Sequence, residues 1–347
     1  MKTKTKRKTN KLTIFLFILD ILACICLFLA YGPISYFRTM LVTTAMETAT
    51  HHYLARTLYS DAIIAKVLNS NYIAENDNST DTSLIKFDNQ DDGNYESIYE
   101  EQILKRDEGN DLYKIIEINE NGYAGYLAVI YDPSKLSLVM AKNPMRGGQT
   151  LTQITETYNA VLATNAGGHY YPYGISNYSI NPAGSIIKDG ELYFAGVRPS
   201  GWGGGFIGFT FDNVLLLSKG TADEVIASGM RDAMEFGPFL IVNGEPSRVV
   251  GNGGYGLAPR TAIGQRKDGI VLLLVIDGRS VGHSLGIDMN SMIDIFIRYG
   301  AYNAANLDGG GSSAMAVNHV IINQPQMYGY ASNRYLYNAW ALIDSEE

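Results

Sequence analysis

An apolar run near the N-terminus constrains this chain more than any other feature of its sequence. Residues 12–31 carry a single charged side chain, Asp20, and six cationic residues lie at or before position 11. A helix of twenty residues is about 30 Å long, which matches the hydrocarbon thickness of a bilayer. Cations on the N-terminal side favour a cytoplasmic N-terminus. We therefore predict a basic cytoplasmic tail over residues 1–11, a single-pass signal anchor in the cell membrane over residues 12–31, and an extracellular remainder.

A cleavable signal peptide is the alternative interpretation of this segment. Signal peptides usually have a shorter apolar region and a cleavage site of small residues. Residues 30–32 read Ala-Tyr-Gly, which fits such a site poorly. The sequence therefore favours an uncut anchor.

The charge balance restricts the ligands that the chain can bind. The sequence has 27 Lys and Arg against 35 Asp and Glu, and six of these cations lie at or before position 11. The remainder of the chain is therefore markedly acidic. Nucleic-acid binders take most of their affinity from clustered cations, so we expect no nucleic-acid partner. An anionic ligand would need a local basic site. Both cysteines, Cys24 and Cys26, lie inside the apolar run, so the remainder must be held together by packing.

Residues 32–110 are predicted to form a helical stalk and a polar linker. Residues 34–70 have apolar positions at helical spacing with no Gly or Pro among them, which indicates one helix leaving the membrane. Residues 75–93 are rich in Asn, Asp, Ser and Thr and lack periodicity, which is typical of a linker.

Residues 111–345 are predicted to form a single mixed α/β domain of the α+β class. Short apolar runs separated by Gly-rich or Asn-rich turns predict strands. These runs are residues 113–118, 124–131, 136–140, 239–242 and 270–276. A capping box of Thr221 and Glu224 predicts one helix, and apolar residues at helical spacing from Met289 to Phe296, followed by Gly300, predict another.

The segment Asn306-Leu-Asp-Gly-Gly-Gly-Ser-Ser313 is the strongest candidate for chemistry. Successive glycines permit positive φ and can turn backbone N–H groups toward one point, which predicts an anion nest that suits phosphate. Asp308 and the two serines add polar side chains beside it. No Lys follows the glycines, so the segment is not a P-loop. A simple tight turn is the alternative.

Two further clusters carry polar residues suited to a site. Residues 165–171 read Asn-Ala-Gly-Gly-His-Tyr-Tyr, where Asn165 and His169 could contact a ligand and the tyrosines could stack on a sugar. Arg260 precedes a buried run, which ends at Asp277 and Arg279. Arginine suits phosphate, and carboxylates at strand ends often serve active sites. A tight turn and a structural Arg–Asp pair remain the alternatives.

Residues 282–286 match the G-x-S-x-G pattern, with Asp308 and His319 following in the order of a serine hydrolase. A nucleophile elbow, however, places its serine directly between a strand and a helix. Ser284 lies eight residues beyond Ile276, the end of the apolar run. A serine esterase is therefore a minor alternative.

Taken in order, these motifs resemble the phosphodiester glycosidase family. They are NAGGHYY, GPFLIVNGE, APRTAIGQ, LLLVIDGR, GHSLG and YGAYNAANLDGGGSSAM. Asp308 and Asp277 match the family's pattern by position, and we predict that they are the catalytic carboxylates. His169 departs from the pattern, because relatives often have an aromatic residue there. We predict substrate or phosphate binding by Asn165, Gly167, Gly168, His169, Arg260, Arg279, Gly309, Gly310, Gly311, Ser312 and Ser313. Arg334 is matched to a late arginine of the family.

The resemblance implies a hydrolase that cleaves a sugar-1-phosphodiester to free sugar and phosphomonoester. Together with the predicted anchor, this gives a membrane-anchored extracellular hydrolase. The substrate class would be an N-acetylglucosamine-1-phosphate diester or a related cell-envelope glycan. A non-catalytic binding or scaffold protein for anionic cell-wall polymers or exopolysaccharide is the alternative. No metal-ligand motif is present and no cofactor is required, although a hard cation held by Asp oxygens is left open.

Overall fold

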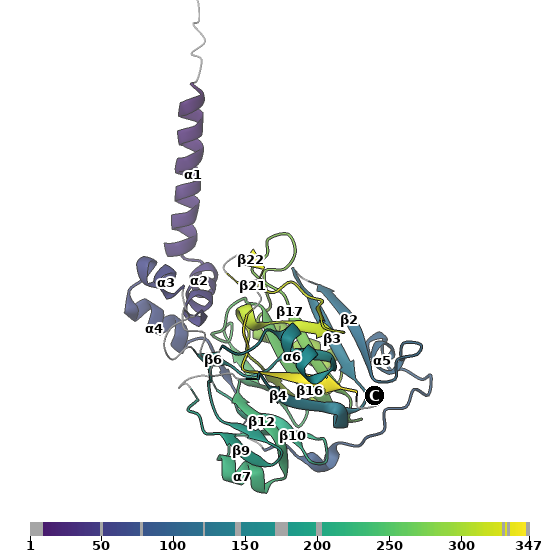
Figure 1. The fold of residues 1–347 in the computed structure, drawn as a ribbon. Coiled ribbons are helices and arrows are strands. Elements are labelled where there is room, and N and C mark those ends of the chain that lie inside the picture. Colours follow the sequence, from purple (N-terminus) through teal and green to yellow (C-terminus); the bar gives the residue numbers. More distant parts are fainter. Residues whose placement is uncertain are drawn as a thin grey trace, which may run out of the picture. The chain divides into compact units, whose positions relative to one another are not determined.

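The computed structural model describes residues 10–48, 51–76, 79–120, 122–142, 147–170, 180–198, 203–327, 330–331 and 334–344. The chain divides into two compact units, Met1–Ser70 and Asn71–Glu347. In Figure 1 the first unit is purple and the second runs from blue to yellow. Each unit is described by itself.

The first unit begins with a long exposed helix, α1 (Lys11–Tyr31). It has 21 residues, a mean hydropathy of 2.9 and no buried residues, so it is long and apolar enough to cross a membrane. Its bounds agree with the predicted span.

Three short helices follow α1, where the sequence predicted one continuous helix. They are α2 (Ser35–Glu47), α3 (His52–Leu58) and α4 (Asp61–Asn69). The apolar residues at helical spacing face one another across these helices and bury a small core that includes Val42, Ala55 and Ile64. A single helix would have left those side chains in water, so the burial of apolar surface explains the difference.

The second unit begins at Asn71, about forty residues before the predicted domain boundary. Strand β1 (Tyr72–Ala74) pairs with β15 (Arg248–Val250), and Ile103 in α5 (Ile98–Leu104) is fully buried. The polar stretch predicted as a linker bonds to the domain instead: Asn243 accepts from the Asp81 N–H and donates to the Ser79 carbonyl. Polar side chains of this stretch also bond to the domain. Composition alone does not show whether polar side chains bond to protein or to water.

Three antiparallel sheets form the second unit. The first, in spatial order, contains β14 (Glu245–Pro246), β13 (Phe239–Val242), β18 (Ala301–Asn306), β16 (Arg260–Arg266), β17 (Val271–Ile276), β3 (Tyr123–Ile130) and β2 (Tyr113–Glu120). The second contains β11 (Leu215–Ser218), β10 (Gly205–Thr210), β12 (Met230–Phe236), β8 (Ile186–Lys188) and β9 (Glu191–Phe194). The third contains β20 (Val320–Ile321), β19 (Met315–Val317), β5 (Ala160–Asn165), β23 (Asn338–Ile343) and β4 (Leu136–Met140). Short pairs are β6 (His169–Tyr170) with β7 (Asn181–Pro182), and β21 (Gln326–Met327) with β22 (Tyr330–Ala331).

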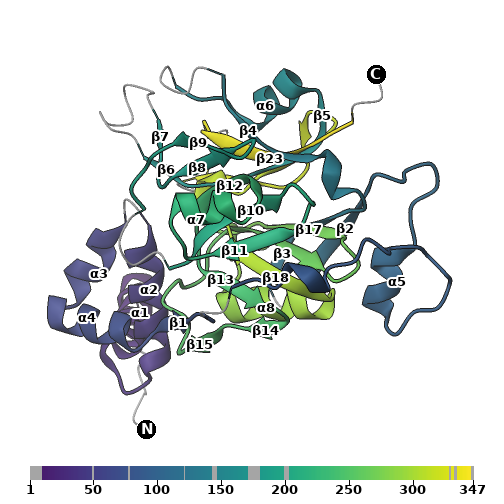
Figure 2. The ribbon, with the colours of Figure 1, turned by 90° about the horizontal axis from the view of Figure 1, so that it is seen from below.

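The three sheets share one central core, and a helix covers the other face of each. Trp340, Phe209 and Phe239 are among the largest side chains in this core. Helix α8 (Met289–Arg298) covers the seven-stranded sheet, α6 (Leu151–Tyr158) covers the third sheet and α7 (Ala222–Ala227) covers the second. Figure 2 shows α6 and α8 on opposite sides of this unit.

The predicted α+β class is confirmed, and so are the strands and helices predicted within residues 111–345. Each predicted apolar strand lies within one or two residues of β2, β3, β4, β13 or β17. Both hydrogen bonds of the capping box at Thr221 and Glu224 are present. In β17, alternate residues enter two different cores, with Leu273 in the central core and Leu272 under α8. Burial on both faces explains why this strand reads as a continuous apolar run.

Candidate active site

The predicted site residues converge because three neighbouring strands of the seven-stranded sheet end at the same edge. Strand β16 starts at Arg260, which pairs with Ile276 immediately before Asp277. Strand β18 ends at Asn306, which pairs with Ala262, and Asp308 follows two residues later. Antiparallel pairing therefore brings Arg260, Asp277 and Asp308 to one edge of the sheet.

Asn165 joins the third sheet to this edge. The residue is buried, its Nδ2 donates to the Asp308 carbonyl at 2.6 Å, and its Oδ1 accepts from the Thr261 hydroxyl at 2.8 Å and the Ala314 N–H at 3.1 Å. The Asp308 N–H in turn donates to the Ala166 carbonyl at 3.0 Å. Both ends of the Asn165 amide are thus engaged by protein atoms. These hydrogen bonds hold the Asp308 backbone in place, so Asn165 positions Asp308.

The two glycines after Asn165 are also used by the fold. The Gly167 N–H donates to Asn338 Oδ1 at 2.8 Å, and a Cβ at Gly167 would lie 3.3 Å from Asn338 Nδ2. The Gly168 carbonyl accepts from the Ala183 N–H at 2.8 Å. Small residues are therefore needed here for close packing against β23.

The glycine-rich loop is not the open anion nest that the sequence predicted. The Gly310 N–H donates to the Pro259 carbonyl at 2.9 Å, and the Ser312 and Ser313 N–H groups donate to the Gly309 and Gly310 carbonyls at 3.2 Å. These bonds close a short 3-10 turn over Gly310–Ser312. Three of the loop N–H groups are therefore already satisfied, because the loop folds back on itself.

Gly310 instead makes room for an arginine. A Cβ on Gly310, which has φ of +64°, would lie 3.2 Å from Arg279 Nη2. A Cβ on Gly309 would lie 2.9 Å from the Pro259 carbonyl oxygen and at an ordinary contact distance, 3.7 Å, from Arg260 Nη1. Arg260 is buried, donates from Nη2 to the Tyr255 carbonyl at 2.6 Å and lies over the Tyr255 ring. Arg279 is exposed and has a left-handed backbone with φ of 60°. Two guanidinium groups therefore flank the loop, one buried and one open to solvent.

Asp308 combines partial solvent access with a desolvated carboxyl group. Burial raises its pKa above the ordinary value, and this effect outweighs the opposing influence of Arg334, the Ser312 hydroxyl, the Gly309 N–H and Arg260. A carboxyl with a raised pKa beside cations is a common feature of active sites.

His169 and Arg334 belong to the same electrostatic environment. Burial, with a smaller contribution from Arg334, lowers the pKa of the His169 imidazole to about 3. His169 is therefore neutral at physiological pH. The charge of Arg334 lowers the pKa of both His169 and Asp308.

The depressed pKa of His169 predicts an acid-sensitive fold. The unfolded imidazole titrates near its ordinary value of 6.5, so between that pH and about 3 the unfolded state binds a proton that the folded state does not. Stability is thus expected to fall as pH decreases through this window, by on the order of a few kcal/mol at the acid end. Urea unfolding at pH 7 and pH 4.5 should show a smaller pH dependence for His169→Gln than for the wild type. Equal pH dependence in both proteins would contradict this assignment.

Asp277 is buried and fully engaged by the protein. Its Oδ1 accepts from Asn323 Nδ2 at 2.8 Å and the Gln324 N–H at 2.9 Å, and its Oδ2 lies 2.8 Å from His283 Nε2. Asn323 also donates to the Ser313 carbonyl at 3.1 Å. Asp277 therefore fixes the far end of the glycine-rich loop through Asn323.

This network predicts that Asp277 contributes mainly to stability. Asp277→Ala leaves several buried donors unsatisfied and is expected to lower the free energy of unfolding by about 3 kcal/mol, whereas Asp277→Asn is expected to cost less. The exposed Asp294, on α8, provides a matched control whose replacement by Ala should change stability by less than about 0.5 kcal/mol. Chemical denaturation of the three variants tests this. A stable but inactive Asp277→Asn would instead support the predicted catalytic role of Asp277.

Ser284 is a structural residue. Its hydroxyl donates to the Asp277 carbonyl at 2.6 Å and accepts from the Ala124 N–H at 3.2 Å, and only 1% of the residue is exposed. His319 lies in the two-residue turn between β19 and β20. The geometry therefore offers no exposed nucleophilic serine at the G-x-S-x-G motif.

Sequence reasoning missed the positioning residues Thr261, Asn323 and Asn338. Thr261 stands next to Arg260 in a motif that had been noted, but Asn323 and Asn338 lie in segments without any local signal. In the described part of the chain, no group of three His, Cys, Asp or Glu side chains is placed to hold a metal.

The site places a desolvated carboxylate among arginines on a three-sheet antiparallel domain, which is an arrangement suited to hydrolysing a phosphorylated glycan. Comparison with known sequences agrees with this class. Residues 158–343, more than half of the chain, match the family described as Phosphodiester glycosidase. The chain belongs to the phosphodiester glycosidase family.

Individual relatives resemble parts of the chain. The SPbeta prophage-derived uncharacterized protein YomE of Bacillus subtilis is 34% identical over 182 residues, 50% of this chain and 27% of that protein. The N-acetylglucosamine-1-phosphodiester α-N-acetylglucosaminidase of Bos taurus is 33% identical over 69 residues, 20% of this chain and 13% of the enzyme. The chain thus spans only a minor part of these two relatives.

A solved structure supports the fold. The catalytic domain of the zebrafish N-acetylglucosamine-1-phosphodiester α-N-acetylglucosaminidase, auto-inhibited by its pro-peptide, matches with a TM-score of 0.53 and 19% identity. The match covers 69% of this chain and 85% of that domain.

Proposed function

We propose that this protein hydrolyses a sugar-1-phosphodiester to free sugar and a phosphomonoester. The observation that carries the proposal is the convergence of Asp308 and Arg260 at one edge of the seven-stranded sheet, where burial raises the pKa of the Asp308 carboxyl. Family membership supports the same reaction class. The bovine relative is named for an N-acetylglucosamine-1-phosphodiester, and we propose this diester or a related cell-envelope glycan as the substrate class.

In the proposed reaction, the oxygen of water bonds to the anomeric carbon while the bond from that carbon to the phosphate oxygen breaks. The leaving oxygen takes the electron pair, and the proton of the water goes to Asp308. A raised pKa makes the Asp308 carboxylate a stronger base for this step. The departing phosphate has a low pKa and needs little protonation, so one carboxylate suffices.

The arginines would hold the phosphate in this reaction. Guanidinium groups offer paired donors to phosphate oxygens and keep their charge at every physiological pH. Arg260 and Arg279 flank the glycine-rich loop, and Arg334 acts on Asp308 and His169. We assign substrate binding to these side chains, and positioning to Asn165 and Asp277.

We further propose that α1 anchors the protein in the cell membrane with the second unit outside. The support is the length and hydropathy of α1, together with the cations at and before its first residue. Protease added to intact cells should then degrade the second unit and leave the N-terminal tail protected. Protection of the whole chain would contradict this orientation.

The test of the activity uses the full-length protein in detergent micelles. UDP-N-acetylglucosamine and a series of N-acetylglucosamine-1-phosphate alkyl esters are incubated with it in ¹⁸O-labelled water. A phosphodiester glycosidase places the label on the sugar, whereas a phosphodiesterase places it on phosphate. Label on phosphate would overturn the proposed bond cleavage. Retention of anionic wall polymer without any release would favour the non-catalytic binding protein.

A further inference from the structure

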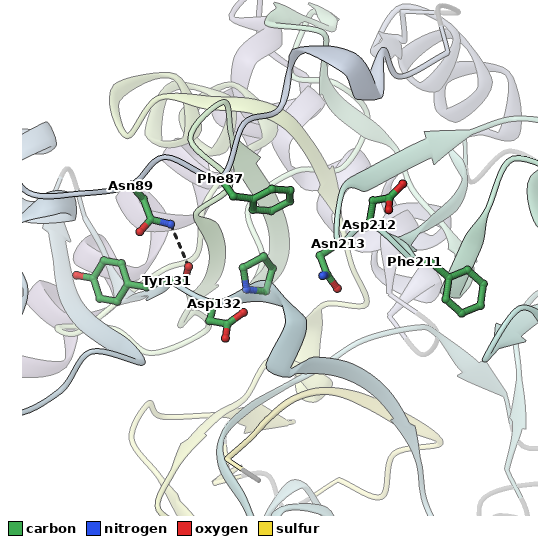
Figure 3. Close-up of a pocket in the computed structure, with 8 residues that line it drawn as sticks. Phe87, Asn89, Tyr131, Asp132, Phe211, Asp212 and Asn213 are labelled. Carbon is green, nitrogen blue, oxygen red and sulfur yellow. Dashed lines mark hydrogen bonds between the residues drawn. The ribbon is translucent and has the colours of Figure 1, made fainter. Parts of the chain in front are cut away.

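The second unit contains a cavity of about 500 Å³ that shares no residue with the candidate active site. Figure 3 shows its lining. The lining residues are Phe87, Asn89, Tyr131, Asp132, Pro133, Phe211, Asp212 and Asn213.

Three segments far apart in the sequence form this cavity, and hydrogen bonds fix them. Asn89, in the stretch that the sequence analysis interpreted as a linker, donates to the Tyr131 carbonyl at 3.1 Å. Asn213 lies in the turn between β10 and β11, where its Oδ1 accepts from Arg231 Nη1 at 2.6 Å. The walls are therefore held in place by the fold.

The charges of the lining differ from those of the active site. Asp132 and Asp212 contribute carboxylates, and the lining contains no Lys, Arg or His. The neighbouring Arg106 donates to Asn89 Oδ1 at 2.9 Å and lies 4.5 Å from the Tyr131 ring centroid. A phosphate group would be repelled by this lining, whereas hydroxyl or amino groups could donate to the carboxylates.

Aromatic surface accompanies these polar groups. Phe87 is 51% exposed, and its ring lies against Gly269, where a Cβ would collide with it. Phe87, Asp132 and Asn213 all line the cavity, and each comes from a different one of its three segments. A sugar ring has apolar C–H faces and hydroxyl groups at its edge, so an aromatic ring beside carboxylate groups matches both parts of it.

We propose that this cavity is a second carbohydrate-binding site, which takes an uncharged or amino-bearing sugar unit without its phosphate. The inference rests on the proposed function, since a glycan substrate supplies such units beyond the cleaved diester. Binding at two places raises the apparent affinity for a long glycan over a short one. The cavity would therefore favour polymeric substrates.

The test measures binding without turnover. Full-length Asp308→Asn protein, in a zwitterionic detergent that carries no sugar, is titrated with tetra-N-acetylchitotetraose and followed by saturation-transfer NMR and calorimetry. Phe87→Leu and Asp212→Asn, each added to this background, are expected to weaken binding at least about tenfold. Tyr193→Leu is the matched control, because Tyr193 is 52% exposed and does not line the cavity. It should leave binding unchanged.

Absence of saturable binding, or equal affinity in the Phe87→Leu and Asp212→Asn variants, would overturn the second site. Failure of the proposed function gives a different pattern. A protein that releases no sugar but binds the oligosaccharide in a Phe87-dependent way would retain the site and lose the enzymatic assignment. Turnover of the small diesters should be the same in wild type and in Phe87→Leu.

Discussion

Replacement of Asp308 by Asn is expected to lower kcat for sugar release by at least about 1,000-fold, with KM changed by only a few-fold. Asn has nearly the same shape and preserves the bonds of the backbone to Asn165 and Ala166. It cannot, however, accept a proton from the attacking water, and general base catalysis together with charge stabilisation is worth this much. Steady-state kinetics with the N-acetylglucosamine-1-phosphate alkyl esters measure both constants.

The same substitution is expected to stabilise the fold at neutral pH. Burial raises the pKa of Asp308, so the folded state disfavours the ionised carboxyl relative to the unfolded state. Asn removes that cost at pH values above the raised pKa, and the gain shrinks as pH falls and the wild-type carboxyl becomes protonated. Thermal unfolding of both proteins at pH 7.5 and pH 4 tests the sign. An inactive variant that is also less stable at pH 7.5 would indicate a structural role for Asp308.

The pH dependence of the wild-type activity should also reflect the raised pKa of Asp308. If Asp308 acts as a base, kcat/KM falls as it becomes protonated, so the acidic limb of kcat/KM lies above the ordinary carboxyl range. The neutral imidazole of His169 contributes no limb near pH 6.5, because its pKa lies at about 3.

The fold could be predicted best where the residues of a single strand or helix are enough to identify it. The run of residues 270–276 is apolar because β17 is buried on both faces, and the Thr221 capping box marks the start of α7 by itself. The helices of residues 35–69 were predicted as one, since their separation depends on a core that forms only when α2, α3 and α4 meet. Residues 75–93 were interpreted as a linker because their partners, such as Asn243, lie far along the chain.

The site shows the same division between local and distant information. Arg260, Asp277 and Asp308 could be identified because each stands at the end of a strand in a distinctive motif. Their separate roles could not, because the hydrogen bonds that occupy Asp277 come from Asn323, Gln324 and His283. The nest predicted at the glycines failed for a related reason. Glycine permits positive φ, but Pro259 determines where the Gly310 N–H is directed.

Arg260 is expected to be the most important of the arginines for substrate binding. Arg260→Lys should lower kcat/KM by about 100-fold, and Arg279→Ala by only about tenfold. Arg260 is buried, so its attraction to phosphate is weakly screened, whereas Arg279 is exposed and competes with water and salt. Lysine keeps the charge but cannot offer two parallel donors to phosphate while it also reaches the Tyr255 carbonyl.

Product inhibition separates this role from a structural one. The phosphomonoester product should inhibit the wild type. Its inhibition constant should rise in Arg260→Lys by a factor similar to the loss in kcat/KM, because the transition state and the bound product both place phosphate against the side chain of residue 260. Arg248 on β15 is exposed, and Arg248→Lys provides a matched control that should leave both constants unchanged. Salt screens the exposed Arg279 more than the buried Arg260. Product inhibition of Arg279→Ala should therefore depend less on the salt concentration than product inhibition of the wild type. An unchanged inhibition constant in Arg260→Lys would show that Arg260 does not bind the phosphate. Arg334 would then be the next candidate for that role.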